Sequence, residues 1–171
     1  VLDVLKTRGA VATFFIIGKN VTGQEPLLRR ILADGHSVGI HTFSHANTFP
    51  LYSKRLMVND IAECKSILDR LSGRDARLFR PPFGVVNPTI AYAVKKLGLE
   101  TVGWSIRSFD TRDYHQDDKS RNLVLDRIIR QLKPGSVILL HDRLQGESAL
   151  VSRLLDFLDA AGYHYDKPLP M

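Results

Sequence analysis

Short apolar segments alternate with helical segments along the whole chain, and this order limits the possible folds more than any other feature. The apolar segment 11–17 is continuous, β-branched and aromatic, as in a strand buried on both faces. Further strands are predicted at 36–41, 78–80, 100–105 and 136–141, and helices at 1–8, 26–33, 54–71, 88–97, 121–132 and 147–160, before a short segment at 163–166. Such alternation predicts parallel strands joined by helical crossovers, and hence an α/β sheet or barrel.

Composition excludes several classes of protein. A chain of 171 residues is long enough to bury a core as one domain. Its single cysteine, Cys64, excludes a disulfide framework and a four-cysteine zinc site, and the helical stripe around it predicts a core position. The longest apolar run, 137–140, is far too short for a membrane span. The net charge is +6, but the basic residues are scattered, which favours a solvated surface over a nucleic-acid footprint.

Polar side chains follow four of the predicted strands. His41 and His45 come after the second strand, Arg80 after the third, Asp110 after the fourth, and His141 ends the fifth. Chemistry in parallel α/β folds collects at the carboxyl ends of the strands. Four strand ends therefore converge on residue types that serve as metal ligands and acid–base groups.

Each of these residues also has a simpler interpretation. The four-residue spacing of His41 and His45 is compatible with an ordinary histidine pair, and zinc would need a further ligand, commonly a carboxylate. His141, directly after four aliphatic residues, suits a general acid or caps a neighbouring carbonyl. Arg80, held extended by the prolines that follow it, suits a carboxylate partner or a surface salt bridge. Asp110 could instead be a turn residue that bonds its own backbone.

Three ordered motifs resemble those of the polysaccharide deacetylases of carbohydrate esterase family 4, the NodB-homology domain. The segment His-Thr-Phe-Ser-His at 41–45 is similar to the H-[ST]-x-x-H motif, Arg-Pro-Pro-Phe-Gly at 80–84 to R-x-P-[YF], and Leu-Leu-His at 139–141 to L-x-H. The strand Ala-Thr-Phe-Phe at 12–15 is an accessory similarity. The resemblance covers nearly the whole chain and implies one polysaccharide deacetylase domain over 1–171, a distorted (β/α)7-type barrel that lacks its first strand.

The resemblance implies a role for each motif residue. His41 and His45 would hold a divalent metal, zinc first and cobalt, nickel or manganese as alternatives, which would polarise the acetyl carbonyl and activate a water molecule. The backbone N–H of Phe83 would help to hold the oxyanion. In the same interpretation His141 protonates the leaving amine, Asp110 orients His141, and Arg80 tunes the base. Pro82, Trp104 and Leu139 would contact the substrate, the last two in an acetyl pocket.

The sequence departs from the family pattern in two places. The D-x-x-D-[WY] motif reads Arg-Ser-Phe-Asp-Thr at 107–111, which removes its first acid and its aromatic residue. The first motif, T-F-D-D-G, which supplies the general base and the third metal ligand, is absent, and Asp3 does not match either aspartate. The 171-residue chain is therefore expected to be N-terminally truncated, or a short form without the base, with little deacetylase activity by itself.

The expected function is removal of N-acetyl groups from N-acetylglucosamine-containing polysaccharide of the peptidoglycan or chitin type. A glycan-binding pseudoenzyme of the same fold is the alternative, and an O-acetyl esterase or a lipid-linked sugar deacetylase stays possible within the fold. The resemblance implies an extracytoplasmic or cell-envelope location. Without a first strand, the segment 11–17 has an open edge, which predicts self-association or pairing with a separate N-terminal strand.

Overall fold

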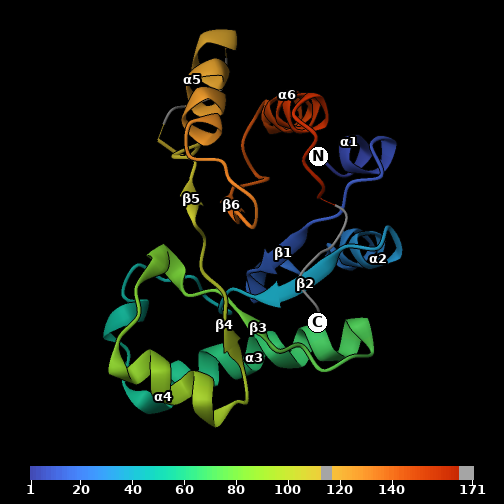
Figure 1. The fold of residues 1–171 in the computed structure, drawn as a ribbon. Coiled ribbons are helices and arrows are strands. Elements are labelled where there is room, and N and C mark those ends of the chain that lie inside the picture. The colour runs from blue at the N-terminus through green and yellow to red at the C-terminus, as the bar shows by residue number, and fades with distance from the viewer. Residues whose placement is uncertain (113–116, 166–171) are drawn as a thin grey trace. The chain divides into compact units, whose positions relative to one another are not determined.

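The computed structural model describes residues 1–112 and 117–165, which form two compact units (Figure 1). One unit is Val11–Gly103, and the other joins Val1–Ala10 to residues 104–165. Each unit contains its own sheet of parallel strands. The predicted α/β class with parallel strands is therefore confirmed.

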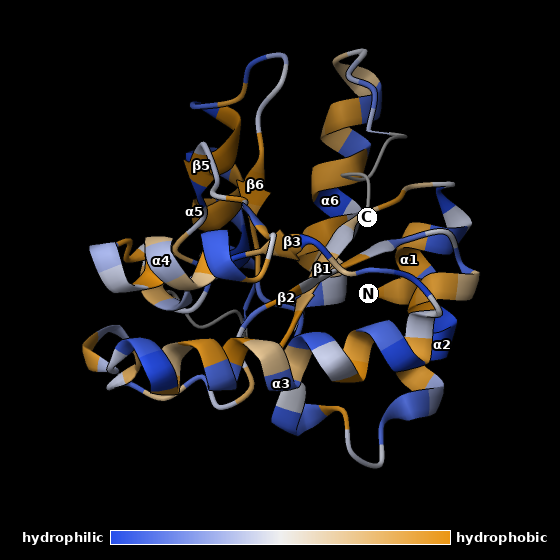
Figure 2. Ribbon diagram, turned by 90° about the horizontal axis from the view of Figure 1, so that it is seen from below, coloured by the Kyte–Doolittle hydropathy of each residue, from blue (hydrophilic) through white to orange (hydrophobic). Residues whose placement is uncertain are grey.

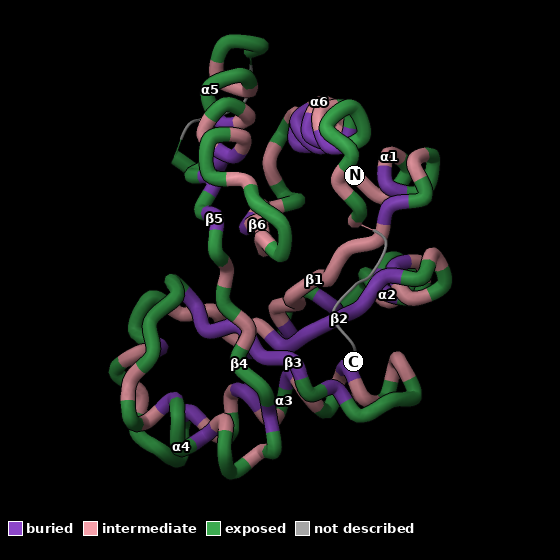
Figure 3. The backbone as a smooth tube through the Cα atoms, viewed as in Figure 1, coloured by how far each residue is buried: buried purple, intermediate pink, exposed green. Residues whose placement is uncertain are grey.

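The unit Val11–Gly103 contains a sheet of four parallel strands in the order β1-β2-β3-β4. These strands are β1 (Thr13–Ile16), β2 (Ser37–Ile40), β3 (Leu78–Phe79) and β4 (Glu100–Thr101). β2 pairs on both sides and is buried along its whole length, drawn purple in Figure 3. Ile40 of β2 lies opposite Phe79 of β3, and this register positions the residues that follow both strands.

Helices α2 and α3 of this unit pack against β2, and α3 also packs against α4. The helical elements are η1 (Gly18–Asn20), α2 (Glu25–Ala33), η2 (Phe49–Leu51), α3 (Lys54–Ser72), η3 (Pro82–Gly84) and α4 (Pro88–Lys96). The side chain of Ser53 caps the start of α3 and Gly73, in the left-handed region, ends it. Figure 2 shows apolar and polar residues alternating along α3, and its buried stripe includes Cys64, as predicted.

The second unit pairs β5 (Ile106–Arg107) with β6 (Ile138–Leu139) in parallel, with Ile106 opposite Ile138. Its helices are α1 (Leu2–Thr7), α5 (Asp118–Ile129) and α6 (Glu147–Ala160). Helix α6 packs against both α1 and α5. Arg8, just after α1, adds ion pairs to Asp156 and Asp159 of α6. No helix in the described part of the chain has the length and apolar character needed to cross a membrane.

The prediction of one strand over 100–105 is wrong. The backbone N–H of Val102 still donates to Phe79 beside β3, but those of Ser105 and Ile106 donate to Val137 beside β6. The chain therefore leaves one sheet and joins the other around Gly103, and β5 begins where the predicted strand ends. The strand predicted at 136–141 is also shorter, at Ile138–Leu139. Residues 163–165 form no regular element, and residue 166 lies outside the described residues.

Candidate functional site

The carboxyl ends of β2 and β3 bring His41 and Arg80 together. Because Ile40 lies opposite Phe79, the next residue on each parallel strand is again a neighbour. His41 Nδ1 lies 2.6 Å from the backbone oxygen of Arg80. A carbonyl oxygen can only accept, so Nδ1 carries the proton and Nε2 keeps its lone pair. A histidine held in this way presents Nε2 in the form that ligates metals.

His45 lies beside His41 at the end of a tight loop. The two imidazole ring centroids are 4.8 Å apart and the rings are tilted by 55°. The backbone N–H of His45 donates to Thr42 Oγ1 at 3.0 Å. The structure thus brings together the two histidines that the sequence predicted as metal ligands.

Strained backbone marks the motif segments. Among the described residues, the non-glycine residues with positive φ are Thr42 at 67°, His45 at 47°, Phe83 at 60° and Phe109 at 57°. All four lie in the three segments 41–45, 80–84 and 107–111. Such a conformation costs roughly 1–3 kcal/mol per residue and clusters at functional sites. The strain therefore supports a functional role for these segments independently of their residue types.

Asp60 of α3 binds the backbone of the loop that carries the two histidines. Its two carboxylate oxygens accept from the backbone N–H groups of Phe43 at 2.8 Å and Ser44 at 3.2 Å. No sequence pattern points to this residue, because its partners lie in a loop 16 and 17 positions earlier. Asp60 thus positions the loop that carries both histidines.

Arg80 is buried and fixed by backbone oxygens. Its Nε donates to Val102 at 3.2 Å and its Nη2 to Gly103 at 2.9 Å, while the guanidinium lies 4.0 Å from the ring centroid of Phe15. Burial lowers the pKa of Arg80 to about 10. The expected role of Arg80 in tuning a base stays a prediction.

The segment after Arg80 turns sharply at η3. Pro82 is buried, whereas Phe83 is 48% exposed. The ring centroid of Phe83 lies 5.3 Å from that of His45, edge to face. The geometry thus places Phe83 at the histidine pair, and the oxyanion role of its backbone N–H stays a prediction.

Asp110 and His141 meet in the second unit, at the carboxyl ends of β5 and β6. The Nδ1 atom of His141 lies 2.9 and 3.0 Å from the two carboxylate oxygens of Asp110, and the backbone N–H of His141 donates to the same carboxylate at 2.6 Å. Burial would raise the pKa of Asp110, but hydrogen bonds from His141 and Ser108 outweigh it and lower the pKa. The structure therefore brings these two predicted residues into direct contact, with an ionised carboxylate against the imidazole.

Glu147 is a further buried acid that the sequence did not single out. It begins α6 and is 2% exposed. Burial first, and then the negative charges of Asp110 and Asp142, raise the pKa of Glu147 to about 8. In the sequence it is one acid in the first turn of a predicted helix, a position that is ordinary for exposed glutamates.

The histidine pair provides two of the side-chain ligands that a divalent metal site needs. Two neighbouring imidazoles suit zinc and related ions. Within residues 1–112 and 117–165, no group of three His, Cys, Asp or Glu side chains is placed to hold a metal ion. Cys64 donates its thiol to the backbone oxygen of Ile16 at 3.3 Å, and burial raises its pKa to about 12, so it is not a thiolate ligand.

The predicted substrate contacts Trp104 and Leu139 belong to the second unit. Leu139 is buried in β6, and Trp104 is half-buried just before β5. Their expected role in an acetyl pocket stays a prediction.

Comparison with known proteins shows the family. The model of the polysaccharide deacetylase family matches residues 1–102. A peptidoglycan-N-acetylglucosamine deacetylase from Bacillus cereus is 32% identical over 168 residues, which cover 96% of this chain and 76% of that protein. A chitooligosaccharide deacetylase from Azorhizobium caulinodans is 35% identical over 143 residues, 83% of this chain and 65% of that protein. The chain belongs to the polysaccharide deacetylase family, as its motifs indicated.

Solved structures confirm the fold. A polysaccharide deacetylase from Bacillus cereus superposes with a TM-score of 0.87 at 31% identity, over 96% of this chain and 82% of that one. A family 4 pseudoenzyme from Bacillus anthracis superposes with a TM-score of 0.83 at 21% identity, over 95% of this chain and 55% of that one. The second likeness shows the fold alone. Because a pseudoenzyme shares this fold, the fold does not by itself establish turnover.

Proposed function

We propose that this chain provides most of the site of a metal-dependent N-deacetylase that acts on N-acetylglucosamine-containing polysaccharide. Family membership and relatives named for peptidoglycan and chitooligosaccharide support this substrate class. Peptidoglycan is a cell-wall polymer, so the proposed place of action is extracytoplasmic. The polymer is of the peptidoglycan or chitin type.

The observation that carries the proposal is the orientation of His41. Its Nδ1 atom donates to a backbone oxygen at 2.6 Å, and the ring of His45 lies beside it. In this proposal the two histidines hold a divalent metal, zinc before cobalt, nickel or manganese. When bound, the metal supplies Lewis-acid activation of a water molecule and of the acetyl carbonyl.

The remaining steps fall to side chains and backbone of this chain. In this step His141 has a proton on each ring nitrogen. The Nδ1–H donates a hydrogen bond to the carboxylate of Asp110, and the Nε2 proton passes to the leaving amine. Asp110 holds the imidazole in that orientation. The backbone N–H of Phe83 donates to the oxygen that gains negative charge during hydrolysis.

A glycan-binding pseudoenzyme is the second candidate function. The observation that favours it is the segment 107–111, in which Arg107 and Thr111 stand at the first acidic position and the aromatic position of the family motif. In the described residues, no group of three His, Cys, Asp or Glu side chains is placed to hold a metal ion. Glycan binding without acetate release would follow.

Acetate release from chitopentaose tests the proposal. We would compare the 171-residue chain with the same chain fused behind the first-motif segment of the Bacillus cereus relative. The fused protein with zinc is expected to release acetate at about 1 per second or faster. The chain alone is expected to be far slower, because the base is absent.

Single substitutions in the fused protein assign the roles. His141→Ala is expected to lower the rate about 100-fold or more, the range of general acid catalysis. His164→Ala, an exposed histidine outside the motifs, is the control and should leave the rate unchanged. Glycan binding with no acetate release from the fused protein would favour the pseudoenzyme. A His41→Ala variant with full activity would contradict the metal assignment.

A further inference from the structure

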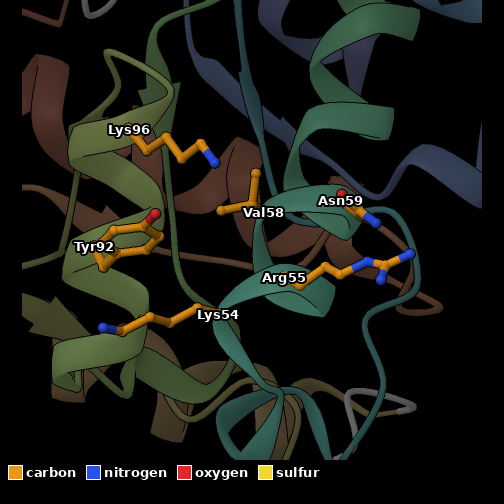
Figure 4. A pocket seen from close by; sticks show the side chains of 6 residues that line it. All are labelled: Lys54, Arg55, Val58, Asn59, Tyr92 and Lys96. Atoms are coloured by element: carbon orange, nitrogen blue, oxygen red, sulfur yellow. The ribbon is translucent and has the colours of Figure 1, made fainter.

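A small pocket opens between α3 and α4, and its lining contains no residue of the motif segments. Its volume is about 240 Å³, and it is lined by Lys54, Arg55, Val58 and Asn59 of α3 and by Tyr92 and Lys96 of α4 (Figure 4). Among the residues that the structure describes, no acidic side chain lines it. The proposed deacetylation uses none of these residues.

The pocket concentrates positive charge that no carboxylate offsets. Lys54, Arg55 and Lys96 form no ion pair with any other residue in the described part of the chain. Elsewhere in the same unit, Lys65 pairs with both Asp69 and Asp75. Three unpaired cations around one hollow repel one another, and an anion in the hollow would relieve that repulsion.

Tyr92 holds two of the cations at the pocket. The ammonium of Lys54 lies 4.9 Å from the centroid of the Tyr92 ring, and that of Lys96 lies 5.9 Å from it. Figure 4 shows the ring between the two lysines, with Lys54 reaching from α3 toward α4. Cation–π contacts of this kind hold flexible ammonium groups in place before a ligand arrives. The pocket is therefore partly organised for an anion.

The same pocket offers neutral polar groups. The Tyr92 hydroxyl and the Asn59 amide can each donate and accept hydrogen bonds, as sugar hydroxyls require. At about 240 Å³ the pocket is smaller than the roughly 300–1,000 Å³ that accommodates drug-sized ligands, so it suits one unit of a polymer.

We propose that this pocket binds an acidic group, a carboxylate or a phosphodiester, carried on a polysaccharide chain. The choice of a polysaccharide rests on the proposed function. A nucleic acid would need several stacking aromatic side chains along a basic stripe, and this pocket has one tyrosine. Of the side chains lining the pocket, Val58 is the one aliphatic residue, so the pocket itself offers little for a lipid tail. The site would hold acidic cell-wall polymer close to the enzyme.

Calorimetric titration of the 171-residue chain at low salt tests the proposal. The probes are an oligogalacturonate for the carboxylate, a glycerol phosphate oligomer for the phosphodiester, and maltopentaose as a neutral oligosaccharide without acetyl groups. At least one charged probe is expected to bind about tenfold more tightly than maltopentaose. Its affinity should fall as salt rises, because the contacts are exposed charges.

A double variant and a matched control locate the site. Lys54→Gln with Lys96→Gln is expected to lower the affinity for the charged probe about tenfold, by removing two charged contacts. Lys95→Gln with Lys133→Gln removes the same charge from exposed lysines that do not line the pocket, and should change the affinity less than about twofold. Matching circular dichroism melts would show that all variants are folded.

Three results would overturn the proposal. An equal loss in the control would show that net charge, and not the pocket, governs binding. Equal affinity for maltopentaose and both charged probes would show that no acidic group is recognised. Binding of duplex DNA or of vesicles with anionic lipids as tightly as the charged oligosaccharides would assign the pocket to another partner.

This test is separate from that of the deacetylase. Acetate release from neutral chitopentaose by the fused protein should be the same with and without the two pocket lysines. Absence of charged-probe binding by the unaltered chain, with full acetate release by the fused protein, would therefore overturn the pocket proposal alone. Absence of acetate release from an otherwise unaltered fused protein is a failure of the proposed function alone.

Discussion

At the scale of single residues, the proton on His41 decides what the histidine pair can bind. The backbone oxygen of Arg80 requires a proton on Nδ1, so the lone pair is on Nε2. His41→Ala removes the Nε2 lone pair that would bind zinc. Elemental analysis after gel filtration should therefore find no zinc retained by this variant. With two protein imidazoles as the assigned donors, zinc affinity of the unaltered chain should already be weaker than in a three-ligand site.

His164→Ala is the matched control for the zinc measurement, because it removes an exposed imidazole outside the motifs. Its zinc content should equal that of the unaltered chain. Unchanged zinc content in His41→Ala would place the metal elsewhere.

Glu147 should make stability depend on pH. Its pKa rises from 4.5 to about 8 in the folded protein. Between these values the folded state keeps a proton that the unfolded state loses, so the free energy of unfolding falls as the pH rises. At 1.36 kcal/mol per pKa unit the loss is on the order of 5 kcal/mol across this window. Urea denaturation of the unaltered chain and of Glu147→Gln at pH 4.5, 6 and 8 measures it.

In Glu147→Gln, the free energy of unfolding is expected to change less with pH between pH 4.5 and about 8 than in the unaltered chain. Glu63→Gln, an exposed glutamate of α3, should leave the profile as it is in the unaltered chain. Parallel profiles for Glu147→Gln and the unaltered chain would mean that Glu147 is ionised when folded.

The functional residue types at the strand ends were predictable from the sequence. The residues and backbone conformations that hold them in place were not. His41, Arg80, Asp110 and His141 follow strands, and an alternating α/β pattern is enough to place them at carboxyl ends. Asp60 could not be found in this way, because its function is a contact between a helix and a distant loop. The positive φ angles of Thr42 and Phe83 likewise arise from tertiary packing, and neither residue type predicts them.

At the scale of elements, α3 connects the core to the histidine loop through Asp60. Asp60→Asn leaves one carbonyl oxygen for the two backbone N–H groups of Phe43 and Ser44. Loss of one charged hydrogen bond should cost about 1.5–3 kcal/mol in unfolding free energy. Because this loop carries both histidines, Asp60→Asn should also lower the zinc affinity, by about tenfold in calorimetric titration.

Glu63→Gln again supplies the control, since it neutralises an acid on the same helix that does not contact the loop. A positioning role requires the zinc affinity to fall in Asp60→Asn and to stay constant in the control. Loss of stability with unchanged zinc affinity would leave Asp60 a structural residue only.

Gly39 of β2 lies where the sheet leaves no room for a side chain. A Cβ atom there would lie 2.6 Å from the Phe15 ring and 3.1 Å from the backbone oxygen of Leu78. Gly39→Ala should therefore destabilise the chain by about 1–3 kcal/mol, the usual cost of overpacking. Gly103→Ala meets nothing within 4 Å and should change the unfolding free energy by far less. Equal effects of the two substitutions in urea denaturation would contradict this packing.

Helix starts were predictable at two of the capping residues. Ser53 and Asn87 each accept a backbone N–H at the start of a helix that was predicted there. The helix predicted at 121–132 lies instead at Asp118–Ile129, after the cap Asp117. Strand boundaries were less predictable. The apolar stretch at 100–105 serves two sheets, and nothing in its composition shows that the chain changes sheets around Gly103.

At the scale of the whole molecule, the end strand of the four-stranded sheet bears on association. β1 is the end strand of the order β1-β2-β3-β4 and pairs with β2. The stretch 11–17 carries no charge. An uncharged edge strand is a template for pairing with another chain.

We expect the chain to associate as its concentration rises, with a scattering mass above that of one chain. A lysine in an edge strand opposes such pairing, so Thr13→Lys should lower the mass toward that of a monomer. Thr101→Lys adds the same charge to the two-residue strand β4 at the other end of the sheet order and should not lower it. A monomer at every concentration, with backbone amides protected from exchange throughout 11–17, would show that this edge is covered within the chain and would contradict the prediction.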